Sequence, residues 1–199
     1  MNAKTLLLFA MLLFAVMVTA QEGNYTLQQI HNLRISTQQT GMMTLGGWAA
    51  GNMLVSGIGM SSTKGSTYRF HQMNVFWNVV NMGIAAGGYF SALPAGDALP
   101  LKETLSEYHR FNNLLLFNAG LDIAYVMAGF YLKEKARNSP KRRDLFKGYG
   151  NSVIMQGAFL FLFDVVLYYV NQSQISDIMD SKQLQFMMTP GGVGVVLTF

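Results

Sequence analysis

The sequence contains no cysteine and few charged side chains. Of its 199 residues, 12% are charged and only 4 are proline. The absence of cysteine excludes disulfide bonds, thiol redox chemistry and metal sites built on thiolates. Soluble domains carry roughly 25% charged residues, about twice the fraction found here, and 51% of this chain is hydrophobic. This composition favours a membrane protein over a soluble bundle with a large core.

The first 20 residues predict a signal peptide. Lys4 precedes an apolar core over residues 6–18, and Val18, Thr19 and Ala20 place small residues before a cleavage site at Gln21. The alternative is that this segment is kept as an uncleaved helix. In either case we expect the chain that follows to begin outside the cytoplasm.

Four apolar segments predict an all-α fold, a four-helix transmembrane bundle. They cover about residues 41–60, 70–92, 111–132 and 149–170. Runs of about 20 apolar residues match the hydrocarbon core of a bilayer. The predicted parts are therefore a signal peptide (1–20), an external amphipathic segment (21–40), the transmembrane domain (41–170) and an external tail (171–199).

Glycine and proline mark two features of this plan. Gly47 and Gly51 have the small-residue spacing that lets membrane helices approach closely, so we expect the first segment to pack in the middle of the bundle. In the tail, Pro190 interrupts the chain, and the alternating apolar side chains over 193–199 predict a short terminal strand.

The charges predict the orientation. The segment 61–69 carries two bases and no acid, and the segment 133–148 carries seven bases and two acids. The segments 93–110 and 171–199 each carry one more acid than bases. By the positive-inside rule both basic turns are cytoplasmic, which places the mature N-terminus and the C-terminus outside an inner (cytoplasmic) membrane. The basic turns are explained by orientation and by attraction to lipid headgroups, so we expect no nucleic-acid partner.

A weak internal repeat suggests two related hairpins. Residues 48–53 resemble 117–123, and residues 76–80 resemble 162–166. If this is a duplication, each hairpin places one polar residue on each helix, and the hairpins are related by an axis along the membrane normal. Chance similarity between apolar segments is the alternative.

Polar side chains recur at helical spacing inside the apolar segments. Because a polar group facing lipid is costly, we expect them to converge in the bundle interior. The candidate cluster is Asn52, Asn74, Asn78, Asn81, Asn118, Asp122, Asp164 and Tyr168. For the asparagines we favour hydrogen bonds that hold helices together.

The two aspartates carry the functional hypothesis. Asp122 and Asp164 are the acids inside the predicted spans, and no Lys or Arg lies there to neutralise them. They are therefore expected to be protonated, to face a wet cavity or to bind a cation. Structural hydrogen bonding is the alternative.

No motif in the sequence names a reaction. HExxH, Gly-x-Ser-x-Gly, a phosphate-binding glycine loop and a bis-histidine pair within a span are all absent. The histidines His31, His71 and His109 are predicted on opposite sides of the membrane and cannot easily converge. We predict no enzyme activity, no metal site and no cofactor.

The exported start with Gln21 after the cut, the Asn- and Gly-rich helices and the Pro190-Gly191-Gly192 break resemble uncharacterised exported four-helix membrane proteins of Bacteroidota-type bacteria. The resemblance implies no activity, because these proteins have none established.

Three functions remain open from the sequence. The first is a structural or accessory subunit that docks a membrane or periplasmic partner through its outer loop and tail. The second is a small permease or ion-conducting protein that uses Asp122 and Asp164, as a homo-oligomer because four helices alone enclose little space. The third is a membrane enzyme acting on a lipid, for which no catalytic set of residues is recognisable.

Overall fold

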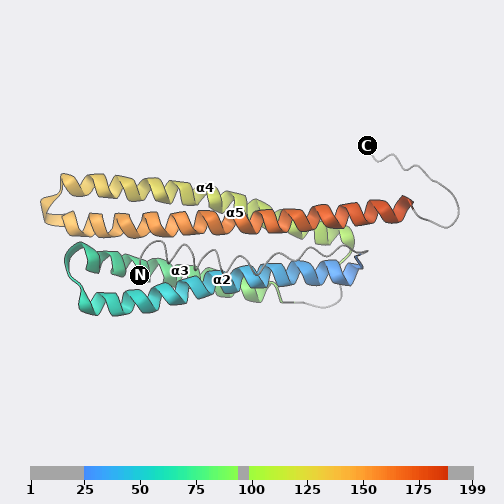
Figure 1. Cartoon of the computed structure of the whole chain (residues 1–199), viewed down its shortest axis with the longest axis horizontal. Coiled ribbons are helices and arrows are strands. Elements are labelled where there is room, and N and C mark those ends of the chain that lie inside the picture. The colour runs from blue at the N-terminus through green and yellow to red at the C-terminus, as the bar shows by residue number, and fades with distance from the viewer. Residues whose placement is uncertain (1–24, 94–98, 188–199) are drawn as a thin grey trace.

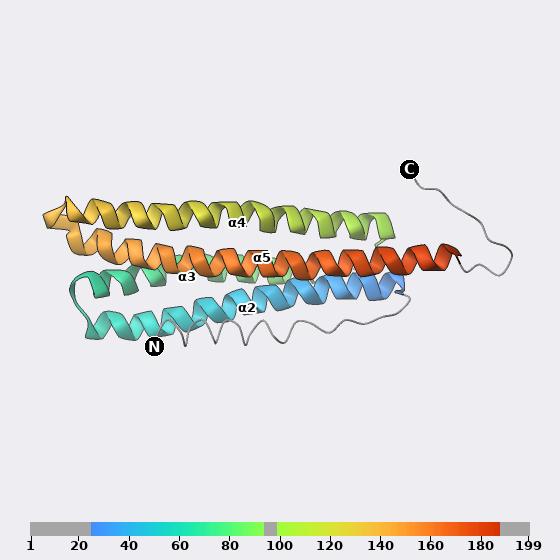
Figure 2. The same cartoon turned by 45° about the horizontal axis from the view of Figure 1, so that its top comes forward.

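The computed structural model of the chain describes residues 25–93 and 99–187, and within these ranges it is helical, without strands. Its helices are α2 (Leu27–Ser62), α3 (Gly65–Ser91), α4 (Leu101–Arg137), the short 3-10 helix η2 (Pro140–Arg142) and α5 (Arg143–Met187). Figures 1 and 2 show an elongated bundle of two antiparallel hairpins, α2 with α3 and α4 with α5. The all-α prediction is confirmed. The predicted signal peptide and terminal strand lie outside the described residues.

Local sequence signals explain where the helices begin and end. Thr26 opens α2 with a capping box, in which its hydroxyl accepts from the Gln29 N–H at 3.2 Å and the Gln29 side chain accepts from the Thr26 N–H at 2.8 Å. Gly65 turns the chain into α3 with a φ of +60°, which favours glycine. Pro140 disfavours helix at the residue before it and so separates α4 from α5.

The helices are longer than the apolar segments predicted to span a membrane. α2 begins at Leu27, so the segment predicted to be external and the first predicted span form one unbroken helix. α5 continues to Met187, so the polar residues after 170 are helical as well. At about 1.5 Å per residue, α5 is roughly 68 Å long, more than twice the ~30 Å hydrocarbon core of a bilayer.

Two of the four helices are long and apolar enough to cross a membrane. They fall in Leu101–Arg137 and Pro140–Asp180, whose most apolar windows have mean hydropathies of 1.5 and 1.9. α2 and α3 do not reach this level, because glycine, serine and asparagine alternate with their apolar residues. The structure therefore supports a helical bundle with two apolar helices.

The hairpins pack together mainly through α3 and α5, whereas α3 and α4 make little contact. The central core contains residues from all four helices: Leu45, Trp48, Ala85, Leu115, Phe159, Phe163 and Leu167. A second core lies toward the end of the bundle opposite the two hairpin turns and contains Ile30, Tyr108, Ile175 and Ile178. α2, α4 and α5 thus contribute to both of these separate cores.

Glycine brings α4 and α5 together, but the two glycines singled out in α2 do not lie at a helix contact. A Cβ added at Gly150 would lie 2.7 Å from the Gly129 carbonyl oxygen, so the two backbones are in contact there. A Cβ added at Gly47 or Gly51 would meet nothing within 4 Å. The prediction that Gly47 and Gly51 place α2 in the middle of the bundle is wrong for this chain, because α2 turns larger side chains such as Trp48 inward and leaves the glycines on its exposed face.

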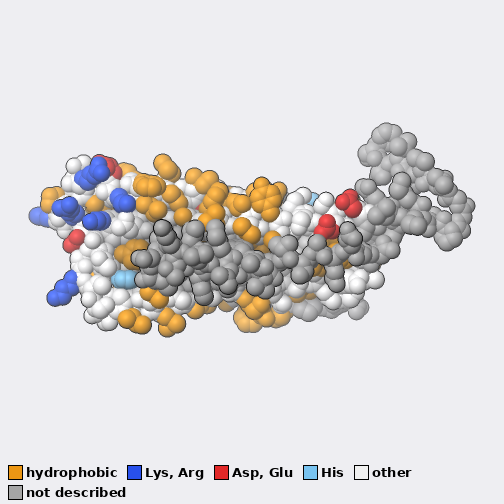
Figure 3. Space-filling model, in the orientation of Figure 1, with side chains coloured by type: hydrophobic (Ala, Val, Ile, Leu, Met, Phe, Trp, Pro, Cys, Tyr) orange, Lys and Arg blue, Asp and Glu red, His pale blue; other side chains and the backbone are white. Residues whose placement is uncertain are grey.

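Charged side chains are segregated along the bundle. The turns of the two hairpins lie at the same end, and Figure 3 shows Lys and Arg side chains gathered there. Acidic side chains are visible toward the opposite end, with hydrophobic side chains between the two.

Candidate functional site

The structure buries most of the polar residues predicted to lie inside. Asn74, Asn78 and Asn81 share the buried face of α3, and Asp122 and Asp164 are buried on α4 and α5. The remaining three differ in exposure: Asn52 is half-buried, Tyr168 is half-buried against the central core, and Asn118 is exposed.

Asn74 is the hub of a hydrogen-bond network that joins three helices. Its amide nitrogen donates to Asn52 Oδ1 at 2.9 Å and to Ser56 Oγ at 2.8 Å, both on α2. Its carbonyl oxygen accepts from Ser152 Oγ at 3.4 Å and from Gln156 Nε2, both on α5. Because each polar atom of the Asn74 side chain has partners, this network holds the hairpins together.

Gln156 extends the network to the central core. Its Oε1 accepts from Trp48 Nε1 at 3.0 Å. The Trp48 ring stacks on Phe159, with ring centroids 3.7 Å apart and an interplanar angle of 4°. Ser152 and Gln156 were not among the predicted site residues, although they lie four residues apart, which places them on one helical face.

Asp122 and Asp164 form a carboxyl pair across the α4–α5 contact. Their carboxyl groups lie close enough to interact, and Asp122 Oδ2 is buried without a described hydrogen-bond partner. Two carboxyl groups can share a hydrogen bond only if at least one is protonated, because an ionised carboxylate has no donor. The two helices are in close contact here, since a Cβ added at Gly157 would lie only 2.9 Å from the Asp122 carbonyl oxygen.

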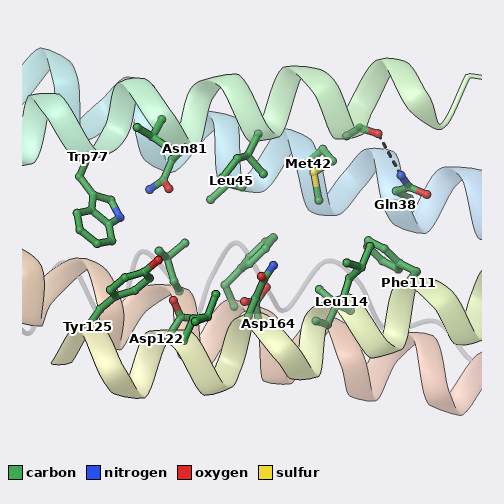
Figure 4. A pocket seen from close by; sticks show the side chains of 18 of the residues that line it. Gln38, Met42, Leu45, Trp77, Asn81, Phe111, Leu114, Asp122, Tyr125 and Asp164 are labelled. Atoms are coloured by element: carbon green, nitrogen blue, oxygen red, sulfur yellow. Dashed lines mark hydrogen bonds between the residues drawn. The ribbon is translucent and has the colours of Figure 1, made fainter. Parts of the chain in front are cut away.

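The carboxyl pair lies on the wall of a cavity of about 370 Å³ between the two hairpins. Figure 4 shows Asp122, Tyr125 and Asp164 on the α4–α5 side, facing Trp77, Asn81 and Leu45 on the α2–α3 side. The described residues that line it include no Lys, Arg or His. This cavity is called the acid cavity below.

Side-chain contacts close the acid cavity at both ends. Toward the hairpin turns, the Trp77 and Tyr125 rings meet edge to face with centroids 4.8 Å apart. Toward the other end, Gln38 Nε2 donates two hydrogen bonds to α3, one to the Gly88 carbonyl oxygen at 3.1 Å and one to Ser91 Oγ at 3.4 Å. α3 and α4 make little contact with each other, and the exposed Asn118 of α4 is one of the residues that line the cavity. Residues of both α3 and α4 line the cavity between these contacts.

A second polar cluster lies beyond the acid cavity, toward the termini. Asn171 donates to Asn112 Oδ1 at 2.6 Å, and Asn112 donates to Gln172 Oε1 at 2.9 Å. Gln174 donates to Thr37 Oγ1 at 2.8 Å, which connects α5 to α2. These side chains satisfy one another, so the cluster is structural in character.

Elsewhere in the described ranges, no three His, Asp or Glu side chains come together in a way that could hold a metal ion. The carboxyl pair offers two oxygen ligands of the kind that bind monovalent or divalent cations only with help from other groups. The residues present therefore fit a site for a proton or a single positive charge better than a metal centre.

Residues 44–165 match the model of DUF6992, a family of unknown function. The matched segment contains the Asn74 network, Asp122 and Asp164, and it ends before Asn171 and Gln174 of the second polar cluster. No curated protein and no solved structure matches the chain.

Proposed function

Because the chain belongs to the DUF6992 family, whose function is unknown, we propose its function from the site. It is an integral membrane protein whose four helices cross the bilayer, and it binds a small cation or protonated amine at Asp122 and Asp164. This is the site of a small permease or ion-conducting protein. The carboxyl pair without a basic neighbour is the observation that carries the proposal.

The exposed surface supports the membrane placement. In the most apolar windows of α4 and α5, 22% and 39% of residues are buried, unlike the core helix of a soluble protein, which is mostly buried. α2 and α3 also expose large apolar side chains, including Leu54, Ile58 and Phe76. Contiguous apolar surface of this kind suits lipid or a partner better than water. The asparagines that lower the hydropathy of α3 face inward, where they are hydrogen-bonded.

The distribution of charge supports the orientation. Both basic turns lie at one end of the bundle, so a single placement of the molecule satisfies the positive-inside rule for both. In this placement the turns are cytoplasmic, and the first residues of α2 and the last of α5 are outside. An exported N-terminus in an inner membrane is consistent with that arrangement.

The chemistry of the pair explains why a cation is the expected ligand. When Asp122 and Asp164 share one proton, the pair carries one negative charge, and no basic side chain of the acid cavity offsets it. An unpaired charge inside a membrane protein is costly, so the pair is stabilised either by a second proton or by a bound cation. Binding of a cation and release of a proton are thereby coupled.

Proton movement in proteoliposomes tests this proposal. The purified protein is reconstituted with a pH-sensitive dye inside, and outward gradients of Na⁺, K⁺ or methylammonium are applied in turn. For at least one of these cations, the wild type is expected to move protons in the opposite direction. Asp122→Asn and Asp164→Asn are expected to lose this exchange, and Asp177→Asn, at an exposed acid of α5, is expected to keep it.

Two results would overturn the proposal. One is the absence of proton movement in the wild type with all three cations. The other is unchanged exchange in both Asp122→Asn and Asp164→Asn, when circular dichroism and gel filtration show that the variants remain folded.

A role as an accessory subunit is the second candidate, and the second core favours it. Ile30, Tyr108, Ile175 and Ile178 continue the bundle beyond the predicted spans, which provides an ordered external surface for a partner. Purification in mild detergent, with and without residues 189–199, tests this role. A defined partner that is lost with the deletion supports it, and a protein that purifies alone in both forms contradicts it.

A further inference from the structure

A second cavity lies between the two hairpin turns at the basic end of the bundle. Its volume is about 620 Å³, and its wall includes four basic side chains: Lys64 and Arg69 from the first hairpin, and Lys141 and Arg142 from the second. Asp144 is the acid among its described lining residues. This cavity, called the tip cavity below, therefore has an excess of three positive charges.

The four basic side chains of the tip cavity make no ion pair with a described residue. Arg69 donates to the neutral Gln72 side chain at 2.7 Å, and its guanidinium lies 5.5 Å from the centre of the Tyr68 ring. Asp144 lies beside the start of α3, where its Oδ2 would be 3.3 Å from a Cβ added at Gly65. Like charges from two hairpins thus line one cavity with only Asp144 to offset them, which disfavours the apposition of the turns.

Basic side chains on the other side of the same end are arranged differently. Arg137 pairs with Glu134 at 2.9 Å. The Lys135 ammonium lies over the Tyr131 and Phe146 rings, and the Lys133 ammonium lies over the Phe130 ring. Each of these three bases thus lies against an acid or an aromatic ring, whereas among the four bases of the tip cavity only Arg69 lies near a described ring and none has a described ion pair.

We propose that the tip cavity binds the phosphate groups of an anionic phospholipid, preferably one with two phosphates such as cardiolipin, and that the lipid holds the two hairpin turns together. Arg and Lys bind phosphate through charge-assisted hydrogen bonds, and basic pockets on the cytoplasmic side of membrane helices accept such headgroups. The excess of three positive charges exceeds what a single phosphate offsets.

The position of the tip cavity favours a lipid over a soluble phosphate. Arg69 directly precedes the predicted second span, so the cavity lies at headgroup level. Met60, Tyr68 and Leu145 add apolar and aromatic surface to its wall, against which a glycerol or the start of an acyl chain can pack. The hairpins already touch beside it, since a Cβ added at Gly148 would lie 2.6 Å from Arg69 Cβ. This inference rests on the membrane placement proposed above.

Lipid retention in nanodiscs tests the inference. The full chain is reconstituted in phosphatidylcholine alone, or with phosphatidylglycerol or cardiolipin at equal total negative charge. Native mass spectrometry of the released protein measures bound lipid, and the unfolding temperature is measured in parallel. The wild type is expected to retain cardiolipin and to unfold at a higher temperature in its presence.

Matched variants separate the tip cavity from general attraction between charges. The combined variant Lys64→Gln, Arg69→Gln, Lys141→Gln and Arg142→Gln is expected to bind cardiolipin about 100-fold more weakly or worse. The control Lys133→Gln, Lys135→Gln, Arg137→Gln and Lys147→Gln removes the same charge and is expected to retain it. Asp144→Asn, which removes the acid, is expected to bind more tightly. Circular dichroism checks that each variant is helical.

Each outcome has a distinct meaning. Equal retention by the two four-residue variants, or no preference of the wild type for anionic lipid, would overturn the inference while leaving the membrane placement intact. Inorganic pyrophosphate that raises the unfolding temperature in phosphatidylcholine as much as cardiolipin does would identify a soluble anion and reject the lipid. Failure of the protein to enter nanodiscs would contradict the membrane placement itself.

Discussion

The carboxyl groups of Asp122 on α4 and Asp164 on α5 are both buried and lie beside each other inside the bundle, close enough for one to donate to the other when it is protonated. Gly157 makes this possible, because α5 has no side chain where it meets the α4 backbone at Asp122. The pair lies in a cavity whose described lining residues include no base. We therefore expect the stable state of this site to include a proton or a cation.

Replacement of Asp164 distinguishes the hydrogen bond from the charge. In Asp164→Asn the amide can still donate to Asp122, so we expect an unfolding temperature close to that of the wild type. In Asp164→Ala the buried Asp122 loses its partner, at a cost of about 1–3 kcal/mol. Thermal unfolding in detergent measures both variants. Equal stability of the Ala and Asn variants would contradict the pairing.

Asn74 is expected to be the most sensitive of the buried asparagines. Asn74→Ala removes bonds to α2 and α5 together and leaves Asn52 and Gln156 with fewer partners. The expected loss of stability is about 1–3 kcal/mol. Chemical unfolding in mixed micelles measures it, and Asn113→Ala, at an exposed position of α4, is the control with little expected effect. A similar loss in both variants would argue against Asn74 as the hub.

Alanine substitutions at Gly150 and at Gly120 test the α4–α5 contact, with Gly120 as the control position. A Cβ at Gly150 would lie 2.7 Å from the Gly129 carbonyl oxygen, so Gly150→Ala must push the helices apart, at about 1–3 kcal/mol. A Cβ at the exposed Gly120 meets nothing within 4 Å. Gly120→Ala is therefore expected to be neutral or stabilising by about 0.5–1 kcal/mol. A lower unfolding temperature for Gly120→Ala than for Gly150→Ala would refute the packing.

Single cysteines test the orientation against a background without native cysteine. Ser139→Cys, in the turn between α4 and η2, is expected to react with an impermeant thiol reagent only after the cells are opened. Ser181→Cys is expected to react in intact spheroplasts. Labelling of Ser139→Cys from outside would reverse the orientation proposed for the basic turns.

Particular residues show how far periodicity alone predicts a site. The spacing of Asn74, Asn78 and Asn81 predicts that they share a face, and they share the buried face of α3. Asn118 has the same spacing relative to Asp122, yet it is exposed. The reason is that α4 turns Leu115, Ala119 and Asp122 inward, which leaves Asn118 at the edge of that face. Spacing defines a face, but not how far around the helix the buried sector extends.

The proposed repeat shows the same limit. It aligns Asn52 and Asn78 of the first hairpin with Asp122 and Asp164 of the second. Asp122 and Asp164 lie beside each other, but Asn52 bonds to Asn74, one turn away from Asn78. The axial register of the two hairpins therefore differs, whatever their origin, and register depends on packing details that no local pattern contains.

Some properties follow from the sequence by itself: helices without disulfides, apolar middles, two basic turns, and acids placed where no base can reach them along the same helix. These depend on local composition and on the period of the helix, which short stretches of chain determine. Only the tertiary structure decided that Asp122 meets Asp164, that Gln156 joins Asn74, and that four unpaired bases from separate turns line one cavity. Those relationships depend on which helices are neighbours, and on their rotation and height, which the packing of the whole bundle sets.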